Sequence, residues 1–144
     1  MKVFFRHAQV DECDSIKLLC DAHRVELGFV MRPSLVAAIA TQEVIVSHND
    51  EDMLIGVVHY HHRRDMQTTL YHLVVTNLAR GQGVGRGLIL ALREESHARG
   101  KAVIRLKCPE PLPANLFYEH VGFTKVAVEP GKSRPLYVWE LAVS

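Results

Sequence analysis

A glycine-rich segment between a predicted strand and a predicted helix is the feature that most constrains the fold of this chain. Residues 80–87 read Arg-Gly-Gln-Gly-Val-Gly-Arg-Gly. They follow the β-rich run 68–76 and precede a stretch with the apolar spacing of a helix, which ends at Gly100. A strand that turns through glycines directly into a helix is typical of α/β domains in which the start of the helix faces a ligand.

The start of that helix is predicted to bind an anion. The first backbone amides of a helix lack partners within it and carry the positive end of its dipole. Gly81, Gly83 and Gly85 leave these amides uncovered, and Arg80 and Arg86 add positive charge at the edges of the loop. We therefore expect a ligand that carries a phosphate; a glycine-rich turn without any ligand is the alternative.

Two common phosphate-binding motifs are excluded by what the segment lacks. A P-loop requires a lysine directly after its last glycine, and no lysine stands near this loop. A dinucleotide-binding fingerprint requires a third glycine where Arg86 or Leu88 stands here. That fingerprint also follows an early strand, whereas three antiparallel strands are expected before this loop.

The remaining elements are predicted from periodicity and from turn residues. Strands are expected over residues 2–6, 43–48, 54–62, 68–76, 102–107, 123–129 and 136–141. Helices are expected between Asp11 and Gly28, from Arg32 onward, from the glycine-rich segment to Gly100, and over 114–121. Because a helix separates strands 68–76 and 102–107, these two are expected to be parallel. The order β-α-α-β-β-β-α-β-α-β-β predicts an α/β (α+β) fold, with a single mixed, mostly antiparallel sheet of about six to seven strands and helices on both faces.

Composition limits the kind of protein and its partners. A chain of 144 residues with a net charge of +1 is expected to form one domain, residues 1–144, without nucleic acid as a partner. Three cysteines without close spacing indicate free thiols. No secretory leader or run of about 18 apolar residues is present, so we expect a cytoplasmic protein without a membrane partner. The C-terminal hairpin is compatible with a homodimer.

Two motifs resemble those of the GNAT superfamily of N-acetyltransferases. Leu73-Val74-Val75 followed by Arg80-Gly81-Gln82-Gly83-Val84-Gly85 resembles its acetyl-CoA signature, and Ala114-Asn115-Leu116-Phe117-Tyr118-Glu119-His120-Val121-Gly122-Phe123 resembles its second conserved helix. Their order and separation, and the order of elements over nearly the whole chain, are also similar. The resemblance implies an N-acetyltransferase that uses acetyl-CoA as co-substrate, without a metal, and that acts on an amine of a small molecule or peptide.

The resemblance also implies residue roles. The coenzyme pyrophosphate is expected on the amides of Gln82, Gly83, Val84, Gly85 and Arg86, with Arg80 and Gly81 shaping the turn. The pantetheine arm is expected to pair along Leu73, Val74 and Val75. An asparagine that is frequent in the family is replaced by Pro111, so Asn115 is the candidate for its contact with the coenzyme. Tyr118 matches the tyrosine that protonates the leaving thiolate; an aromatic core residue is the other interpretation.

The residue that removes the proton from the amine is not set by the motifs. Thr69 and Tyr71 are expected on the coenzyme side of their strand, with His72 on the other, and family members that use a base here hold Glu or His on the coenzyme side. His59 and His61 share one face of the preceding strand and are the candidate bases, since an imidazole titrates near neutral pH. Ordinary pleat residues and, less favoured, a zinc site are the alternatives.

The motifs do not fix the role of Cys108, the class of acceptor or whether the protein turns over. Cys108 ends a strand near the expected thioester, where it is either a covalent acetyl carrier or, as favoured, a small packing residue. Glu26, Arg32 and Glu43 lie near the expected acceptor wall but differ in sign, so they predict no acceptor class. An acetyltransferase by direct attack is the first hypothesis, and a catalytically weak module that binds or senses acyl-CoA is the second.

Overall fold

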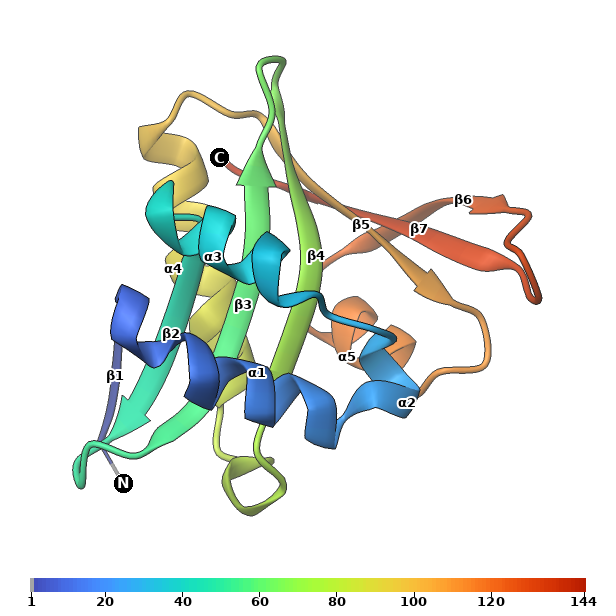
Figure 1. Cartoon of the computed structure of the whole chain (residues 1–144). Coiled ribbons are helices and arrows are strands. Elements are labelled where there is room, and N and C mark those ends of the chain that lie inside the picture. The colour runs from blue at the N-terminus through green and yellow to red at the C-terminus, as the bar shows by residue number, and fades with distance from the viewer. Residues whose placement is uncertain (1) are drawn as a thin grey trace. The chain divides into compact units, whose positions relative to one another are not determined.

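The computed structural model describes residues 2–144 (Figure 1). The strands are β1 Val3–His7, β2 Val44–Asn49, β3 Leu54–His62, β4 Gln67–Val75, β5 Val103–Pro109, β6 Thr124–Glu129 and β7 Leu136–Ala142. The helices are α1 Cys13–Ala22, α2 Arg24–Leu27, α3 Arg32–Ala40, α4 Val84–Ala98 and α5 Ala114–His120. Short 3-10 turns span Val10–Glu12 and Asn77–Ala79.

All seven strands belong to one sheet, in the order β1-β2-β3-β4-β5-β7-β6. β4 and β5 are parallel, whereas the pairs β1–β2, β2–β3, β5–β7 and β6–β7 are antiparallel. The predicted mixed, mostly antiparallel sheet is thus confirmed, and so is the parallel pair across the helix that follows the glycine loop.

The predicted first helix is divided in the structure. α1 ends at Ala22, His23 leaves the helical conformation, and the four-residue α2 follows before Gly28 stops the chain at φ +75°. A positive φ costs glycine little, which is why the predicted end at Gly28 is correct. α3 begins at Arg32 with Pro33 in its first turn, as expected from the fixed φ of proline.

One compact unit contains the residues up to 61 together with 72–92. In it, Figure 1 shows α1 and α3 in front of β2 and β3 and α4 behind them. On the front face, Val46 and Val57 pack in one buried cluster with Ile16 of α1 and Leu35 of α3. On the other face, a Cβ added at Gly56 would come within 3.0 Å of Leu88 of α4. Both faces of these strands are therefore covered by helices.

The second compact unit contains residues 62–71 and 93–144. β5 pairs with β7 over seven residues, from Val103 opposite Ala142 to Pro109 opposite Leu136. Its charged side chains form ion pairs, with Arg105 3.4 Å from Glu140 and Lys107 2.8 Å from Glu129. These four charged residues therefore neutralise one another along the strands.

A second network in this unit is built around His62. Its Nδ1 lies 2.8 Å from the Thr68 hydroxyl, and its Nε2 lies 2.9 Å from a carboxylate oxygen of Glu95. The Thr68 hydroxyl also contacts the Ser96 hydroxyl, at 2.9 Å. Buried polar groups that satisfy one another in this way fix the register of the segments that carry them.

β4 contains one residue more than β3 between two matched backbone hydrogen bonds. Arg63 N donates to Gln67 O, and Thr76 N donates to Ile55 O. From Ile55 to Arg63 the chain advances eight residues, whereas from Gln67 to Thr76 it advances nine. The extra residue is a β-bulge, and strict alternation of side chains cannot be carried across it.

The β4–β5 ladder is short. It joins Gln67 to Val103, Thr68 to Ile104 and Thr69 to Arg105 and extends no further in the part of the chain that the structure describes. β4 itself continues to Val75. Its last residues therefore have backbone groups that this ladder does not use.

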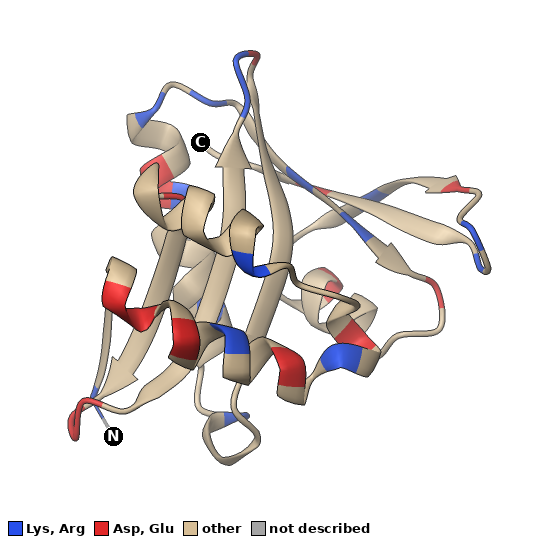
Figure 2. Ribbon diagram, viewed as in Figure 1, with Lys and Arg blue, Asp and Glu red and all other residues tan. Residues whose placement is uncertain are grey.

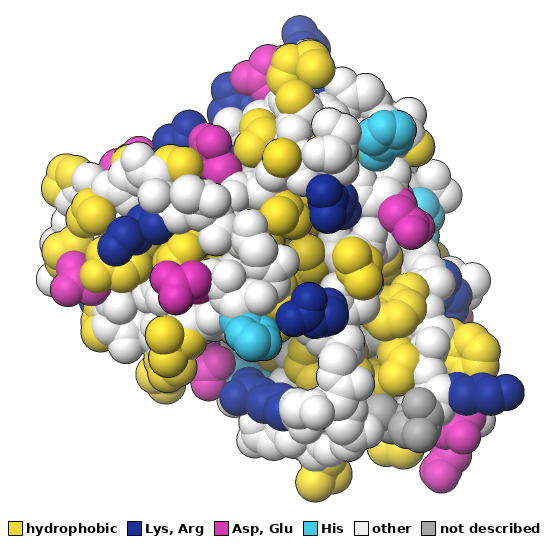
Figure 3. Space-filling view, turned by 180° about the vertical axis from the view of Figure 1, so that it is seen from behind, with side chains coloured by type: hydrophobic (Ala, Val, Ile, Leu, Met, Phe, Trp, Pro, Cys, Tyr) yellow, Lys and Arg dark blue, Asp and Glu magenta, His cyan; other side chains and the backbone are white. Residues whose placement is uncertain are grey.

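Surface charge is mixed in sign. Figure 2 shows acidic and basic residues alternating along α1 and α2, and Figure 3 shows both kinds interspersed on the opposite face. No helix within residues 2–144 has the length and apolar character needed to cross a membrane. Cys13, Cys20 and Cys108 are free thiols, as predicted.

Candidate functional site

The glycine loop presents a row of backbone amides. Gly81 and Gly83 have φ values of +77° and +81°, and a Cβ at either position would meet no atom within 4 Å. The first bond within α4 runs from Gly87 N to Gly83 O at 2.9 Å. The amides of residues 83–86 therefore precede the first amide that donates within the helix, Gly87 N, and point their hydrogens out of the start of α4. This is the geometry of an anion site with open space beside it.

The Arg80 side chain forms its contacts elsewhere than at this row of amides. Its Nε donates to Val75 O at 3.2 Å, and its Nη2 lies 3.3 Å from His23 Nδ1 and 3.6 Å from Glu26 Oε2. The arginine thus links the end of β4 to the α1–α2 region, a contact that local spacing did not predict. Arg86 is exposed in the first turn of α4, where its charge can reach an anion.

The end of β4 presents two distinct faces. Val74 is buried in the cluster with α1 and α3, whereas Leu73 and Val75 are only partly buried. Since alternate residues point to opposite faces, Leu73 and Val75 point away from that cluster. Their backbone lies beyond the last pair of the β4–β5 ladder. This end of β4 thus lies outside the ladder, with Val75 O bonded to Arg80 Nε, and the binding of an extended ligand arm along it stays a prediction.

The two candidate histidines of β3 differ sharply. His59 is 7% exposed, and its Nδ1 lies 3.1 Å from Nδ1 of His72, with the rings stacked at 5.3 Å between centroids. Burial, then His72, lowers the pKa of His59 to about 4, against an opposing effect of Glu43. Burial also lowers the pKa of His72. Both rings are therefore neutral at pH 7.

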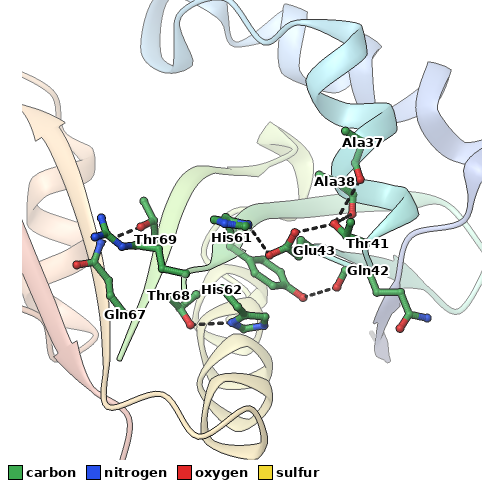
Figure 4. A network of polar contacts seen from close by, with 12 residues as sticks. Ala37, Ala38, Thr41, Gln42, Glu43, His61, His62, Gln67, Thr68 and Thr69 are labelled. Carbon is green, nitrogen blue, oxygen red and sulfur yellow. Dashed lines mark hydrogen bonds and ion pairs between the residues drawn. The ribbon is translucent and has the colours of Figure 1, made fainter. Parts of the chain in front are cut away.

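His61 is half exposed and pairs with a buried carboxylate. Its Nδ1 lies 2.8 Å from Glu43 Oε2, and the Thr41 hydroxyl donates to Glu43 Oε1 at 2.6 Å (Figure 4). The same hydroxyl lies 3.3 and 3.2 Å from the Ala37 and Ala38 carbonyls at the end of α3, which fixes its position beside the carboxylate. The sequence placed His59 and His61 on one face, but it did not indicate that Glu43 and His72 would be their partners.

Tyr118 lies in the second unit, among aromatic rings. It is 7% exposed and stands edge-on to Phe117 and to Phe123, with 5.5 Å between centroids in each case. Burial, and then the nearby Cys108 thiol, raises the pKa of Tyr118. No residue within the described range 2–144 forms a hydrogen bond with the Tyr118 hydroxyl. A buried tyrosine usually finds such a partner, so this hydroxyl is available to a ligand.

Asn115 uses its whole side chain within the protein. Its amide nitrogen donates to the carbonyls of Pro109, Glu110 and Leu112 at 2.8–3.0 Å. Its oxygen accepts from Trp139 Nε1 at 2.9 Å. Contact between Asn115 and the coenzyme stays a prediction, and these bonds favour a structural role.

Cys108 and Arg32, two other candidate residues, are constrained by their surroundings in the protein. Burial raises the pKa of the Cys108 thiol to about 11, which leaves little thiolate at neutral pH. Arg32 forms an ion pair with Asp14 at the surface. Its charge is therefore matched within the protein, as that of Glu26 is by Arg80.

Comparison with solved structures supports the fold. Ard1 from Thermoplasma volcanium superposes with a TM-score of 0.88 at 16% identity, covering 100% of this chain and 99% of that one. The protein yncA from Salmonella typhimurium, solved with its cofactor acetyl-CoA, gives a TM-score of 0.80 at 18% identity, covering 100% of this chain and 95% of that one. An aminoglycoside 6'-N-acetyltransferase in complex with coenzyme A gives 0.82 at 18% identity, covering 98% and 97%.

Comparison of sequences gives the family. No curated protein sequence matches the chain. The family described as acetyltransferase (GNAT) domain matches residues 23–134, which include the glycine loop and the helix that carries Tyr118. The chain belongs to the GNAT family of acetyltransferases.

Proposed function

We propose that this protein transfers an acetyl group from acetyl-CoA to a primary amine of a small molecule or peptide. The observation that carries the proposal is the row of uncovered amides at residues 83–86, together with the end of β4 that lies beyond the β4–β5 ladder. A phosphate-bearing cofactor with an extended, amide-containing arm can bond to both. Structures similar in fold were solved with acetyl-CoA and with coenzyme A.

The amides would bind the coenzyme pyrophosphate. Glycines at 81 and 83 keep the approach open, and the exposed Arg86 adds positive charge. Arg80 acts indirectly, by fixing Val75 at the end of β4. Backbone groups of Leu73 and Val75 would then pair with the pantetheine amides, and donors there would stabilise negative charge on the thioester oxygen.

Direct attack by the amine fits the thiol chemistry. The amine nitrogen forms a bond to the acetyl carbon, the carbon–sulfur bond breaks, and the thiolate of coenzyme A departs. A covalent acetyl-cysteine is disfavoured because the pKa of Cys108 is raised to about 11. The departing thiolate needs a proton, and Tyr118 is the proposed donor because burial keeps its phenol protonated.

The experiment measures coenzyme binding and thiol release separately. Acetyl-CoA is titrated by calorimetry, and free thiol is then followed with a panel of peptide N-termini, lysine derivatives, polyamines and aminoglycosides. We expect binding and acceptor-dependent thiol release, with the acetylated amine seen by mass spectrometry. Binding without release across the panel would instead support the alternative, a module that senses acyl-CoA.

A further inference from the structure

The contact between the nearly parallel rings of His59 and His72 is the feature that the proposed function leaves unexplained. The two rings come from neighbouring strands, and their Nδ1 atoms lie 3.1 Å apart. One ring is almost fully buried and the other is partly buried. A close contact between two basic rings is stable only when they do not both carry a charge.

This contact restricts where the ring protons lie. In an Nδ1–Nδ1 hydrogen bond, one ring must carry a hydrogen on Nδ1 and the other must offer a lone pair there. If His72 is the donor, its Nε2 has a lone pair and can accept a proton. If His59 is the donor, His72 Nε2 already carries hydrogen. The tautomer of the pair thus decides whether His72 can act as a base.

We propose that His72 Nε2 accepts the proton of the acceptor amine, and that His59 is a positioning residue that accepts a hydrogen bond from His72 Nδ1–H. The proposal rests on the acetyltransferase function proposed above. In the balanced step, the ammonium loses one proton to His72 Nε2, and the neutral amine attacks the acetyl carbon. The carbon–sulfur bond breaks, the thiolate takes the proton of Tyr118, and the nitrogen gives its second proton to water, from which Tyr118 is reprotonated. The resulting imidazolium gives its proton to water before the next cycle.

The position of His72 on β4 supports this choice. It directly precedes Leu73 and, by alternation, points to the opposite face of β4, so the strand itself separates it from the side chains of Leu73 and Val75. It also contacts His59, which lies two residues from Val57 on β3 and therefore on the face covered by α1 and α3. The helix that carries the anion site, α4, covers the other face. His72 is therefore placed for an amine that approaches the thioester from the α1 and α3 side.

The surroundings of His59 and His72 keep both rings uncharged. Glu43 and His61 are the other titratable groups that act on His59, in opposite directions, and burial outweighs both. For His72, burial is the sole cause of the lowered pKa. At neutral pH, both rings are therefore deprotonated and can accept a proton. His61 contacts Glu43 through its Nδ1, so its Nε2 is the second candidate for the base, and the His72 variant below decides between the two.

The test combines three variants with a matched control. His72→Asn removes the base but keeps a donor near the position of Nδ1. His59→Asn keeps an acceptor oxygen near Nδ1, whereas His59→Leu removes the acceptor. His97→Asn, at an exposed position of α4, is the control. For each we would measure acetyl-CoA affinity, kcat, and the pH profile of kcat/KM for the best amine of the panel.

We expect His72→Asn to lower kcat about 100-fold and to remove the acidic limb of the profile, with acetyl-CoA affinity unchanged. We expect His59→Asn to stay near wild type and His59→Leu to lose about tenfold in kcat. Wild-type activity and an unchanged acidic limb in His72→Asn would overturn the assignment of the base. Equal loss in both His59 variants would overturn the positioning role.

A spectroscopic measurement separates this inference from the proposed function. Long-range proton–nitrogen NMR of the wild type reports the tautomer of each ring, and a hydrogen on His72 Nδ1 is expected. A hydrogen on His72 Nε2 at neutral pH would contradict the inference even if acetyl transfer is observed. If the wild type binds acetyl-CoA but acetylates no amine, the proposed function fails, and the base assignment fails with it.

Discussion

Trp139 Nε1 donates a hydrogen bond to Asn115 Oδ1 at 2.9 Å, across 24 residues of sequence. The amide nitrogen of the same asparagine holds three carbonyls of the segment between β5 and α5. Asn115 thereby fixes the start of the helix that carries Tyr118. Asn115, for which the motif resemblance predicts a contact with the coenzyme, therefore holds the start of that helix in place.

Asn115→Ala is expected to lower the free energy of unfolding by about 3 kcal/mol, since it leaves several buried polar groups without partners. Urea unfolding of the whole chain measures this, with the exposed Asn77→Ala as a control that should change stability by less than about 0.5 kcal/mol. Weakened acetyl-CoA binding with normal stability would instead show a direct contact with the coenzyme.

Gly83→Ala is expected to weaken coenzyme binding more than it lowers stability. Alanine at a φ of +81° costs about 1 kcal/mol, and its methyl group would stand beside the row of amides. Gly100→Ala is a matched control, because Gly100 has a φ of +73° and equally open surroundings at the other end of the α4 region. Both variants should lose similar stability, but calorimetry with acetyl-CoA should detect weaker binding only for Gly83→Ala. Equal affinities would remove the loop from the binding site.

The sequence predicted the features that depend on local periodicity. The strand over residues 54–62 has the expected bounds because its β-rich run is limited by polar turns on both sides. The parallel pairing of β4 with β5 followed from the helix between them. Positive φ at Gly28 and Gly100 agrees with their predicted place at helix ends.

Contacts between distant segments could not be predicted in the same way. The partnership of His59 with His72 depends on the register of β3 and β4, and the bulge in β4 changes that register by one residue. The contact from Arg80 to Glu26 joins a loop to a helix 54 residues earlier. No periodic pattern reports either contact, because each depends on how the elements pack.

Tyr118→Phe is expected to reduce kcat with little change in acetyl-CoA affinity, because it removes the hydroxyl and keeps the ring between Phe117 and Phe123. A loss of about 100-fold would match the usual contribution of a positioned acid. Since burial raises the pKa of Tyr118, the wild-type rate should not fall between neutral pH and about pH 9 through ionisation of this residue. Phe117→Leu, a packing change beside it, is the control. Wild-type turnover in Tyr118→Phe would exclude the acid role.

The neutral state of His59 predicts a dependence of stability on pH that does not require activity. Its pKa falls from an ordinary 6.5 to about 4 on folding, so the unfolded chain binds more protons than the folded one in this interval. The contribution of His59 to the free energy of unfolding is fully present above about pH 6.5. It is lost as the pH falls toward about 4, and the loss amounts to at most about 3 kcal/mol.

Urea unfolding between about pH 7 and pH 4 measures this loss, and the slope rather than the absolute stability is the informative quantity. His59→Leu should flatten the curve, because the leucine does not titrate. His97→Leu, at an exposed position, should retain the slope of the wild type. A wild-type slope in His59→Leu would mean that His59 is not held neutral by burial, and the tautomer argument for His72 would lose its basis.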